Sequence, residues 1–142
     1  PGSFVFDPFV GTGSVLVAAA ARGALCFGTD IDIRVLRGKG GRKIADNFRQ
    51  YGLPLPELAR VDNSEGFRCL REMPIYHAII CDPPYGVRAG ARKSGSRRAV
   101  VKPIRDDLRA DHIPQTQPYH AVDVMADLLS MAARTLLLGG RL

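Results

Sequence analysis

Residues 3–14 read Ser-Phe-Val-Phe-Asp-Pro-Phe-Val-Gly-Thr-Gly-Ser, and this stretch decides the fold class. The run Ser3–Asp7 is short, apolar and β-prone, which predicts a buried strand, and Ser14–Arg22 predicts a helix. Gly11 and Gly13 between them permit a tight turn and let a ligand approach the backbone. Free N–H groups at the start of the following helix favour an anion. A strand, a glycine loop and a helix in this order are typical of α/β sheets that bind a ligand at the loop.

The glycine loop alone does not identify its ligand. No Gly-Lys-Ser/Thr follows it, so it is not a Walker loop, and Leu16 stands where a dehydrogenase fingerprint has its third glycine. Many loops of this composition are only tight turns.

Strands and helices alternate along the rest of the chain. We expect further strands at Ala24–Thr29, Leu58–Val61 and Tyr76–Cys81, and helices at Glu65–Glu72 and Ala121–Leu138. The stretch Ile33–Tyr51 is also helical in character but is broken by Gly38, Gly40 and Gly41. This order predicts an α/β fold, a parallel sheet with helices on both faces. Arg141 and Leu142 look like the start of a fifth strand. Residues 1–142 are therefore expected to be a partial domain, truncated after the fourth strand and its helix and belonging to a larger protein.

An acidic residue follows or ends each of the four strands: Asp7, Asp30, Asp62 and Asp82. The carboxyl ends of parallel strands form the ligand crevice of an open sheet, so these carboxylates are candidates for binding. Any one of them could instead cap a helix, which is the commoner role of an Asp in this position.

Asp30 follows Gly13 by 17 residues, close to the spacing at which an acid binds both hydroxyls of a ribose. Asp32 is a second candidate for that role or the N-cap of the next helix. The pair Asp62-Asn63 could bind an adenine amino group, and a plain cap fits it equally well.

Residues 82–86, Asp-Pro-Pro-Tyr-Gly, are the most specific motif. The two prolines fix a rigid turn, and the Asp82 carboxylate and the Pro83 carbonyl can both accept from one planar exocyclic NH₂. Tyr85 can stack on the base that carries this amine. The motif indicates a site that orients an amine toward an electrophile.

The charge of the chain is concentrated in one segment. The net charge is +6, and residues 87–110 carry eight basic and two acidic residues while the remainder is balanced. This part of the basic loop 87–119 suggests a polyanionic partner, although a solvated charge run would have the same composition. The candidate nucleic-acid contacts are Arg88, Arg92, Lys93, Arg97 and Arg98.

Composition excludes several other classes. The 142 residues are 46% hydrophobic and 24% charged, as in a globular domain, and no apolar run has the length of a membrane span. Three cysteines without a Cys/His cluster exclude a disulfide or zinc scaffold, suit a reducing compartment and leave no candidate metal ligands.

The motifs resemble those of class I S-adenosylmethionine-dependent methyltransferases that act on amino groups. The chain is similar over nearly its whole length to the eukaryotic tRNA guanine-10 N2-methyltransferase catalytic subunits, on the following motifs: Asp7-Pro-Phe-Val-Gly-Thr-Gly, Gly28-Thr-Asp-Ile-Asp, Asn47-Phe-Arg-Gln-Tyr-Gly-Leu, Asp82-Pro-Pro-Tyr-Gly-Val-Arg and Leu138-Gly-Gly-Arg-Leu.

This resemblance implies a Rossmann-like sheet, S-adenosylmethionine as cofactor, tRNA as substrate and a cytoplasmic location. It implies that the cofactor contacts are Asp7, Phe9, Gly11, Gly13, Asp30, Ile31, Asp62 and Asn63. It places the guanine against Asp82, Pro83, Pro84 and Tyr85. It also implies an N-terminal RNA-binding region and a small zinc-binding activator subunit, so we expect the bare chain to be inactive.

Three alternatives remain open from the sequence. The first is an amino methyltransferase acting on adenine, in DNA or RNA, or on a protein glutamine. The second is a cofactor-binding scaffold without catalysis. The third, a nicotinamide oxidoreductase, leaves the Pro-Pro-Tyr motif unexplained.

Overall fold

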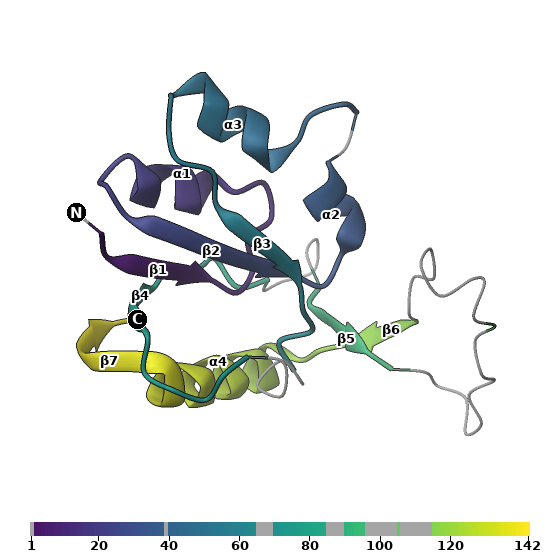
Figure 1. Cartoon of the computed structure of the whole chain (residues 1–142). Helices are drawn as coiled ribbons and strands as arrows, with labels where there is room; N and C mark the ends of the chain where they lie inside the picture. The colour runs from purple at the N-terminus through teal and green to yellow at the C-terminus, as the bar shows by residue number, and fades with distance from the viewer. Residues whose placement is uncertain (1, 39, 65–69, 85–89, 96–104, 106–114) are drawn as a thin grey trace.

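A computed structural model gives the fold of the chain, and it describes residues 2–38, 40–64, 70–84, 90–95, 105 and 115–142. Its centre is a five-stranded parallel sheet in the order β3-β2-β1-β4-β7. The strands are β1 Phe4–Asp7, β2 Leu25–Asp30, β3 Glu57–Arg60, β4 Tyr76–Ile79 and β7 Leu136–Arg141. The helices are α1 Ser14–Ala20, α2 Ile33–Arg37, α3 Ile44–Gln50 and α4 Ala121–Thr135. Figure 1 shows α1, α2 and α3 on one face of the sheet and α4 on the other.

The alternation of side chains along β1 builds two cores. Val5 points to the α1/α3 face and packs in a cluster with Leu16 and Phe48, whereas Phe6 points to the α4 face. The Phe6 ring stacks on Tyr76 with ring centroids 4.8 Å apart. Complete burial of such side chains contributes about 1.5–3 kcal/mol each, so both faces of β1 stabilise the sheet.

The glycine loop is fixed from the α3 side. Gly13 has φ 80°, and a Cβ there would lie 2.6 Å from Cγ2 of Ile44, so glycine is required on two counts. The Asn47 side-chain amide donates to the carbonyl of Thr12 at 3.2 Å. The loop between β1 and α1 is thereby attached to α3.

The predicted order of the first four strands along the chain is confirmed. The helical stretch Ile33–Tyr51 is broken as predicted: it forms two helices, α2 and α3, and Gly38, Gly40 and Gly41 between them have positive φ. Most of the predicted helix Glu65–Glu72 lies outside the described residues, and its described part, 70–72, is not helical.

The prediction that the sheet stops after the fourth strand is wrong. Helix α4 ends at Thr135 rather than Leu138, and Leu136–Arg141 forms β7, which pairs with β4 in parallel. A run of three leucines suits a strand as well as a helix, and β4 offers its backbone groups as a partner. Strand β4 is thus paired on both sides, with β1 and with β7.

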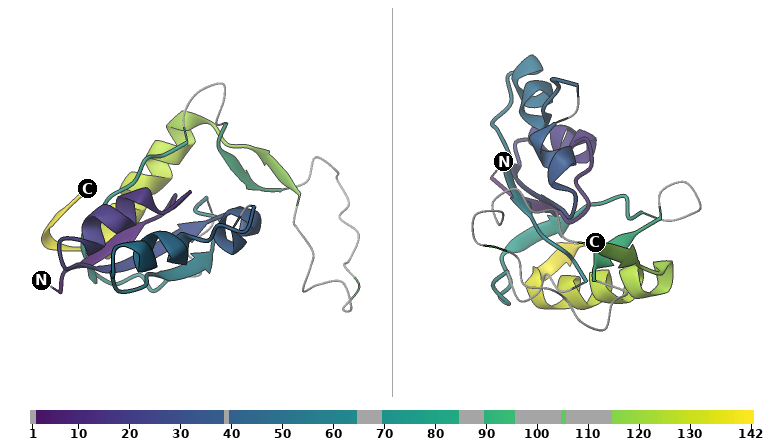
Figure 2. Two further views of the ribbon diagram at one scale, coloured as in Figure 1. Left: turned by 90° about the horizontal axis from the view of Figure 1, so that it is seen from above. Right: turned by 90° about the vertical axis from the view of Figure 1, so that its right-hand side faces the viewer.

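The segment 87–119, predicted to be irregular, contains two short strands. Residues Arg92–Ser94 (β5) and Thr116–Pro118 (β6) form an antiparallel pair in the register Arg92↔Pro118. In Figure 1 and the left view of Figure 2 this hairpin projects beyond the carboxyl ends of the sheet strands.

Candidate cofactor and substrate pocket

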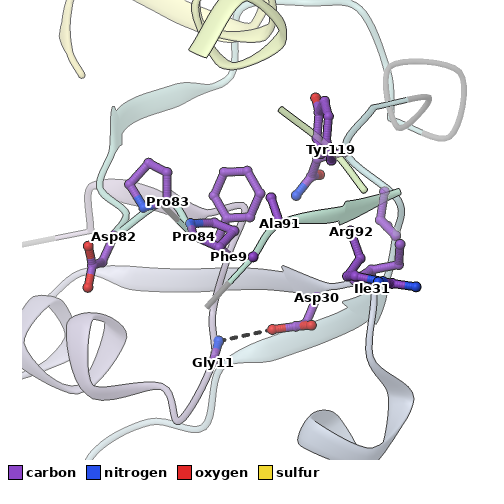
Figure 3. A pocket seen from close by; sticks show the side chains of 13 residues that line it. Phe9, Gly11, Asp30, Ile31, Asp82, Pro83, Pro84, Ala91, Arg92 and Tyr119 are labelled. Carbon is purple, nitrogen blue, oxygen red and sulfur yellow. Dashed lines mark hydrogen bonds between the residues drawn. The ribbon is translucent and has the colours of Figure 1, made fainter. Parts of the chain in front are cut away.

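A cavity of about 420 Å³ lies at the carboxyl ends of the sheet strands, where the ligand crevice of an open α/β sheet is expected. Figure 3 shows Asp82 and Pro83 on one side of it and Ile31 and Arg92 on the other. Its described lining is Phe9, Gly11, Asp30, Ile31, Val61, Asn63, Asp82, Pro83, Pro84, Gly90, Ala91, Arg92 and Tyr119. Segments far apart in sequence therefore converge on one space, and its volume suits a small organic molecule.

Asp30 connects the end of β2 to the glycine loop. One carboxylate oxygen accepts from the Gly11 N–H at 3.2 Å, and the other accepts from the Asp32 N–H at 2.8 Å. Burial raises the pKa of Asp30, and these hydrogen bonds oppose the rise. Asp30 thus presents a positioned acceptor at the cavity.

Asp32 has the structure of a helix cap. Its carboxylate accepts from the Arg34 N–H at 2.9 Å and forms an ion pair with the Arg34 guanidinium at 2.6 Å. The hydrogen bond from Arg34 lowers the pKa of Asp32. Of these two carboxylates, only Asp30 lines the cavity.

Asp7 lies behind the cavity lining and is 1% exposed. Its carboxylate accepts from the Phe9 N–H at 2.9 Å and so shapes the loop. Burial raises the pKa of Asp7 to about 6, and the negative charges of Asp30 and Asp82 add to the rise. Three of the four predicted strand-end carboxylates therefore interact through their charges.

The fourth carboxylate, Asp62, is not among the described lining residues. It accepts from the Ser64 hydroxyl at 2.7 Å and from the backbone N–H of Ser94 in β5. Burial raises the pKa of Asp62, but the hydrogen bonds from Ser64 and Ser94 outweigh it and lower the pKa overall. Its neighbour Asn63 lines the cavity and donates to the Pro8 carbonyl, so the predicted pair divides into one hairpin anchor and one lining residue.

The turn at 82–84 forms the wall opposite Ile31. Asp82, Pro83 and Pro84 all line the cavity, as Figure 3 shows, whereas Tyr85 lies outside the described residues. An acidic acceptor beside a rigid, apolar turn can hold a planar amine in one orientation.

The hairpin supplies a wall that the sequence did not predict. Tyr119 lies at its base, packs with Ala91, Val124 and Phe9, and donates its hydroxyl to Asp127 of α4. Burial raises the pKa of Tyr119, and the bond to Asp127 adds to the rise. An aromatic residue just before a helix is the only sequence signal for this position.

The predicted nucleic-acid contacts have partners where the structure describes them. Arg92 donates to the Thr116 hydroxyl at 2.8 Å and carbonyl at 2.7 Å, and the Lys93 ammonium lies 5.2 Å from the centre of the Tyr119 ring. Both side chains therefore brace the hairpin. Arg88, Arg97 and Arg98 lie outside the described residues.

The other predicted cofactor contact, Gly13, packs against Ile44 rather than lining the cavity. The described part of the chain contains no group of three or more His, Cys, Asp or Glu arranged to bind a metal ion. Nor does any helix in it combine the length and apolarity needed to cross a bilayer.

A family model described as RMKL-like, methyltransferase domain (UPF0020) matches residues 1–99. The chain belongs to this methyltransferase family. An rRNA methylase from Streptococcus thermophilus has a similar structure, with a TM-score of 0.53 at 16% identity over 98% of this chain and 58% of that one, which supports the shared fold.

Several curated relatives of this RMKL-like domain carry a more specific name. The tRNA (guanine(10)-N(2))-methyltransferase TRMT11 of Dictyostelium discoideum is 46% identical over 99% of this chain and 28% of its own length. The protein of the same name from Homo sapiens is 40% identical over 97% of this chain and 33% of its own length. The chain thus spans about 30% of the length of the relatives that it matches.

Proposed function

We propose that the chain is the cofactor- and base-binding part of an S-adenosylmethionine-dependent methyltransferase that modifies the exocyclic N2 amine of a guanine in tRNA. The observation that carries this proposal is the meeting of the glycine loop, Asp30 and the Asp82–Pro84 turn around one cavity. The names of the relatives support the choice of tRNA guanine.

The lining fits the proposed cofactor by chemistry. Asp30 offers acceptors for ribose hydroxyls, Phe9 and Ile31 offer apolar surface, and Asn63 offers an amide beside them. Gly11 has φ 49° and an open side, so the backbone can be approached there. When bound, S-adenosylmethionine supplies an electrophilic methyl group. The three neighbouring carboxylates Asp7, Asp30 and Asp82 suit the positive charge of its sulfonium.

Asp82 and Pro83 would act on the other reactant. Guanine N2 is a weak nucleophile because its lone pair is delocalised into the ring. Acceptors at the Asp82 carboxylate and Pro83 carbonyl would bind its hydrogens, orient the lone pair and stabilise the positive charge that develops on nitrogen. We place Tyr85 as the stacking residue for the base. A base within a stem must leave its stack before it can enter the pocket.

The basic residues Arg88, Arg97 and Arg98 would contact RNA phosphates, while Arg92 and Lys93 contribute mainly by bracing the hairpin. The family resemblance further suggests a small zinc-binding activator subunit, which co-purification with the full-length protein tests.

Replacement of Asp82 tests the proposal. In the full-length protein that carries this chain, Asp82→Asn should lower methyl transfer to a tRNA transcript about 10²-fold or more, because it removes the negative charge that stabilises the positive charge developing on nitrogen. Affinity for S-adenosylmethionine, measured by calorimetry, should change little. Glu57→Gln, a substitution of an exposed acid at the start of β3, is the matched control and should leave both quantities unchanged.

The substrate is tested by mass spectrometry of the methylated product. N2-methylguanosine at position 10 supports the proposal, and loss of the product when that guanine is replaced by adenine confirms the position. Methyladenine or methylglutamine would identify one of the alternative amino methyltransferases. Cofactor binding without transfer to any substrate would indicate a scaffold.

A further inference from the structure

A second basic surface lies on α2 and the segment that leads to α3. We call Arg34, Arg37, Arg42, Lys43 and Arg60 the α2 basic surface, and all five side chains are exposed. No acidic residue occurs between positions 33 and 45. This surface is separate in sequence from the basic loop 87–119.

The acids that flank this segment are already engaged. Asp32 pairs with Arg34, and Asp46 pairs with Arg49 at 3.0 Å while also accepting from the Lys43 backbone N–H. In the described part of the chain, no carboxylate lies within ion-pair distance of Arg37 or Arg42. Among the described residues, these two exposed guanidinium groups therefore have no counter-charge.

The α2 basic surface borders the pocket. Arg60 is the last residue of β3. Its Nε–H donates to the carbonyl of Ile31, a lining residue, at 3.1 Å. Helix α2 begins two residues after Ile31. Figure 1 shows α2 and the β5/β6 hairpin at the same end of the sheet. This surface thus borders the pocket on the side of Ile31, where Arg92 of the hairpin also lies and which faces the Asp82–Pro84 turn across the cavity (Figure 3).

The proposed cofactor does not explain these charges. S-adenosylmethionine has no phosphate, and the Asp30 carboxylate beside the surface would repel a 2′-phosphate of another nucleotide. Exposed arginines without counter-ions suit the repeated charges of a nucleic-acid backbone, and Arg binds phosphate through two parallel hydrogen bonds.

We infer that the α2 basic surface binds the phosphodiester backbone of the RNA whose base enters the pocket, on the side of Ile31 and opposite the Asp82–Pro84 turn. The inference rests on the proposed function for the identity of the RNA. Phosphate contacts at this surface would set the orientation of the strand over the pocket without reading its sequence.

The test compares two double variants with equal loss of charge. Arg37→Gln/Arg42→Gln removes the unpaired arginines of the surface. Arg22→Gln/Arg71→Gln removes two exposed arginines that precede β2 and β4, at the opposite end of the sheet. Binding of a fluorescent tRNA transcript to the 142-residue chain is measured by anisotropy at several salt concentrations, without cofactor.

Each phosphate contact adds about one unit to the slope of log K against log salt, so the surface variant should lose about two units. When the salt concentration rises from 50 to 200 mM, the tRNA affinity of the surface variant should therefore fall by a factor about 16 times smaller than the factor for the wild type. The control variant should keep the wild-type slope.

Three results would overturn the inference: no RNA binding by the wild-type chain, an unchanged slope in the surface variant, or an equal change in both variants, which reflects net charge alone. The methyl-transfer assay on the full-length protein separates this inference from the proposed function. Methyl transfer to tRNA together with an unchanged salt slope in the surface variant refutes only RNA binding by the α2 basic surface. A changed salt slope without any methyl transfer refutes only the assignment as a methyltransferase.

Discussion

At the scale of single residues, the Asp30 and Asp32 carboxylates lie two positions apart and have different surroundings. Asp30 accepts from the glycine loop and lines the cavity, whereas Asp32 caps α2 and pairs with Arg34. The spacing from Gly13 could not separate them, because both side chains follow the same strand. Their hydrogen-bond partners do separate them, so the same substitution at the two positions should have different effects.

Asp30→Ala should weaken S-adenosylmethionine binding roughly 10- to 150-fold, since a hydrogen bond to a charged group contributes about 1.5–3 kcal/mol. Asp32→Ala should instead cost about 1 kcal/mol of stability through the lost cap and leave the affinity unchanged. Calorimetry with the cofactor and urea unfolding measure the two effects. A loss of affinity in Asp32→Ala alone would assign the ribose contact to that residue.

At the scale of elements, the β5/β6 hairpin is a wall of the pocket held at both ends. Asp62 accepts from the Ser94 N–H, and Tyr119 donates to Asp127. The Tyr119 N–H also donates to the Ala91 carbonyl at 2.9 Å. The hairpin therefore connects the end of β3 to α4 across the cavity.

The coupling between Tyr119 and Asp127 is open to a double-mutant cycle. Tyr119→Phe and Asp127→Ala should each lower the free energy of unfolding, and the double variant should lose less than their sum by about 1 kcal/mol or more. The exposed Tyr51→Phe change is the control and should have almost no effect. Additive losses would show that the hydrogen bond contributes nothing to stability.

The first four strands of the sheet were predictable because each lies in a short, largely apolar run that ends at or leads into an acid, whereas the leucines of β7 were assigned to the preceding helix. The hairpin was not predictable, since β5 and β6 have three polar or mixed residues each and pair across more than 20 positions. Asp62, like Asp30, comes at the carboxyl end of a predicted strand. Its carboxylate accepts from Ser94 of the hairpin and does not line the described cavity, a difference that could not be predicted without the hairpin. The sequence predicted eight of the lining positions assigned to cofactor and base, but it gave no sign of Val61, Gly90, Ala91 or Tyr119.

At the scale of the whole molecule, acidic and basic groups are segregated around the pocket. Asp30 and Asp82 in its walls interact through their charges with Asp7 behind the lining, while the α2 basic surface and Arg92 of the hairpin lie at its border. The central arrangement is costly when no cation is present, because the buried Asp7 must ionise beside two other carboxylates. This cost makes the stability of the fold depend on pH.

The last prediction concerns that dependence. The pKa of Asp7 is about 6 in the fold against 3.8 as the ordinary value, so between these pH values the folded state keeps a proton that the unfolded state has lost. Raising the pH through this window should lower the free energy of unfolding by up to about 3 kcal/mol. Asn at position 7 cannot ionise but can still accept from the Phe9 N–H. Asp7→Asn should therefore exceed the wild type in stability by up to about 3 kcal/mol at pH 7.5, and the difference should vanish below pH 4.

Urea unfolding of both proteins from pH 3.5 to 8 measures this difference, and a second variant checks its sign. The pKa of Asp46 is lowered by the hydrogen bond from the Lys43 N–H, so its contribution is present above its ordinary pKa and is lost as the pH falls. Asp46→Asn should accordingly be less stable than the wild type at pH 7.5 and approach it at low pH. A stability difference for Asp7→Asn that stays constant across the range would mean that the Asp7 carboxylate ionises in the fold as it does in the unfolded chain.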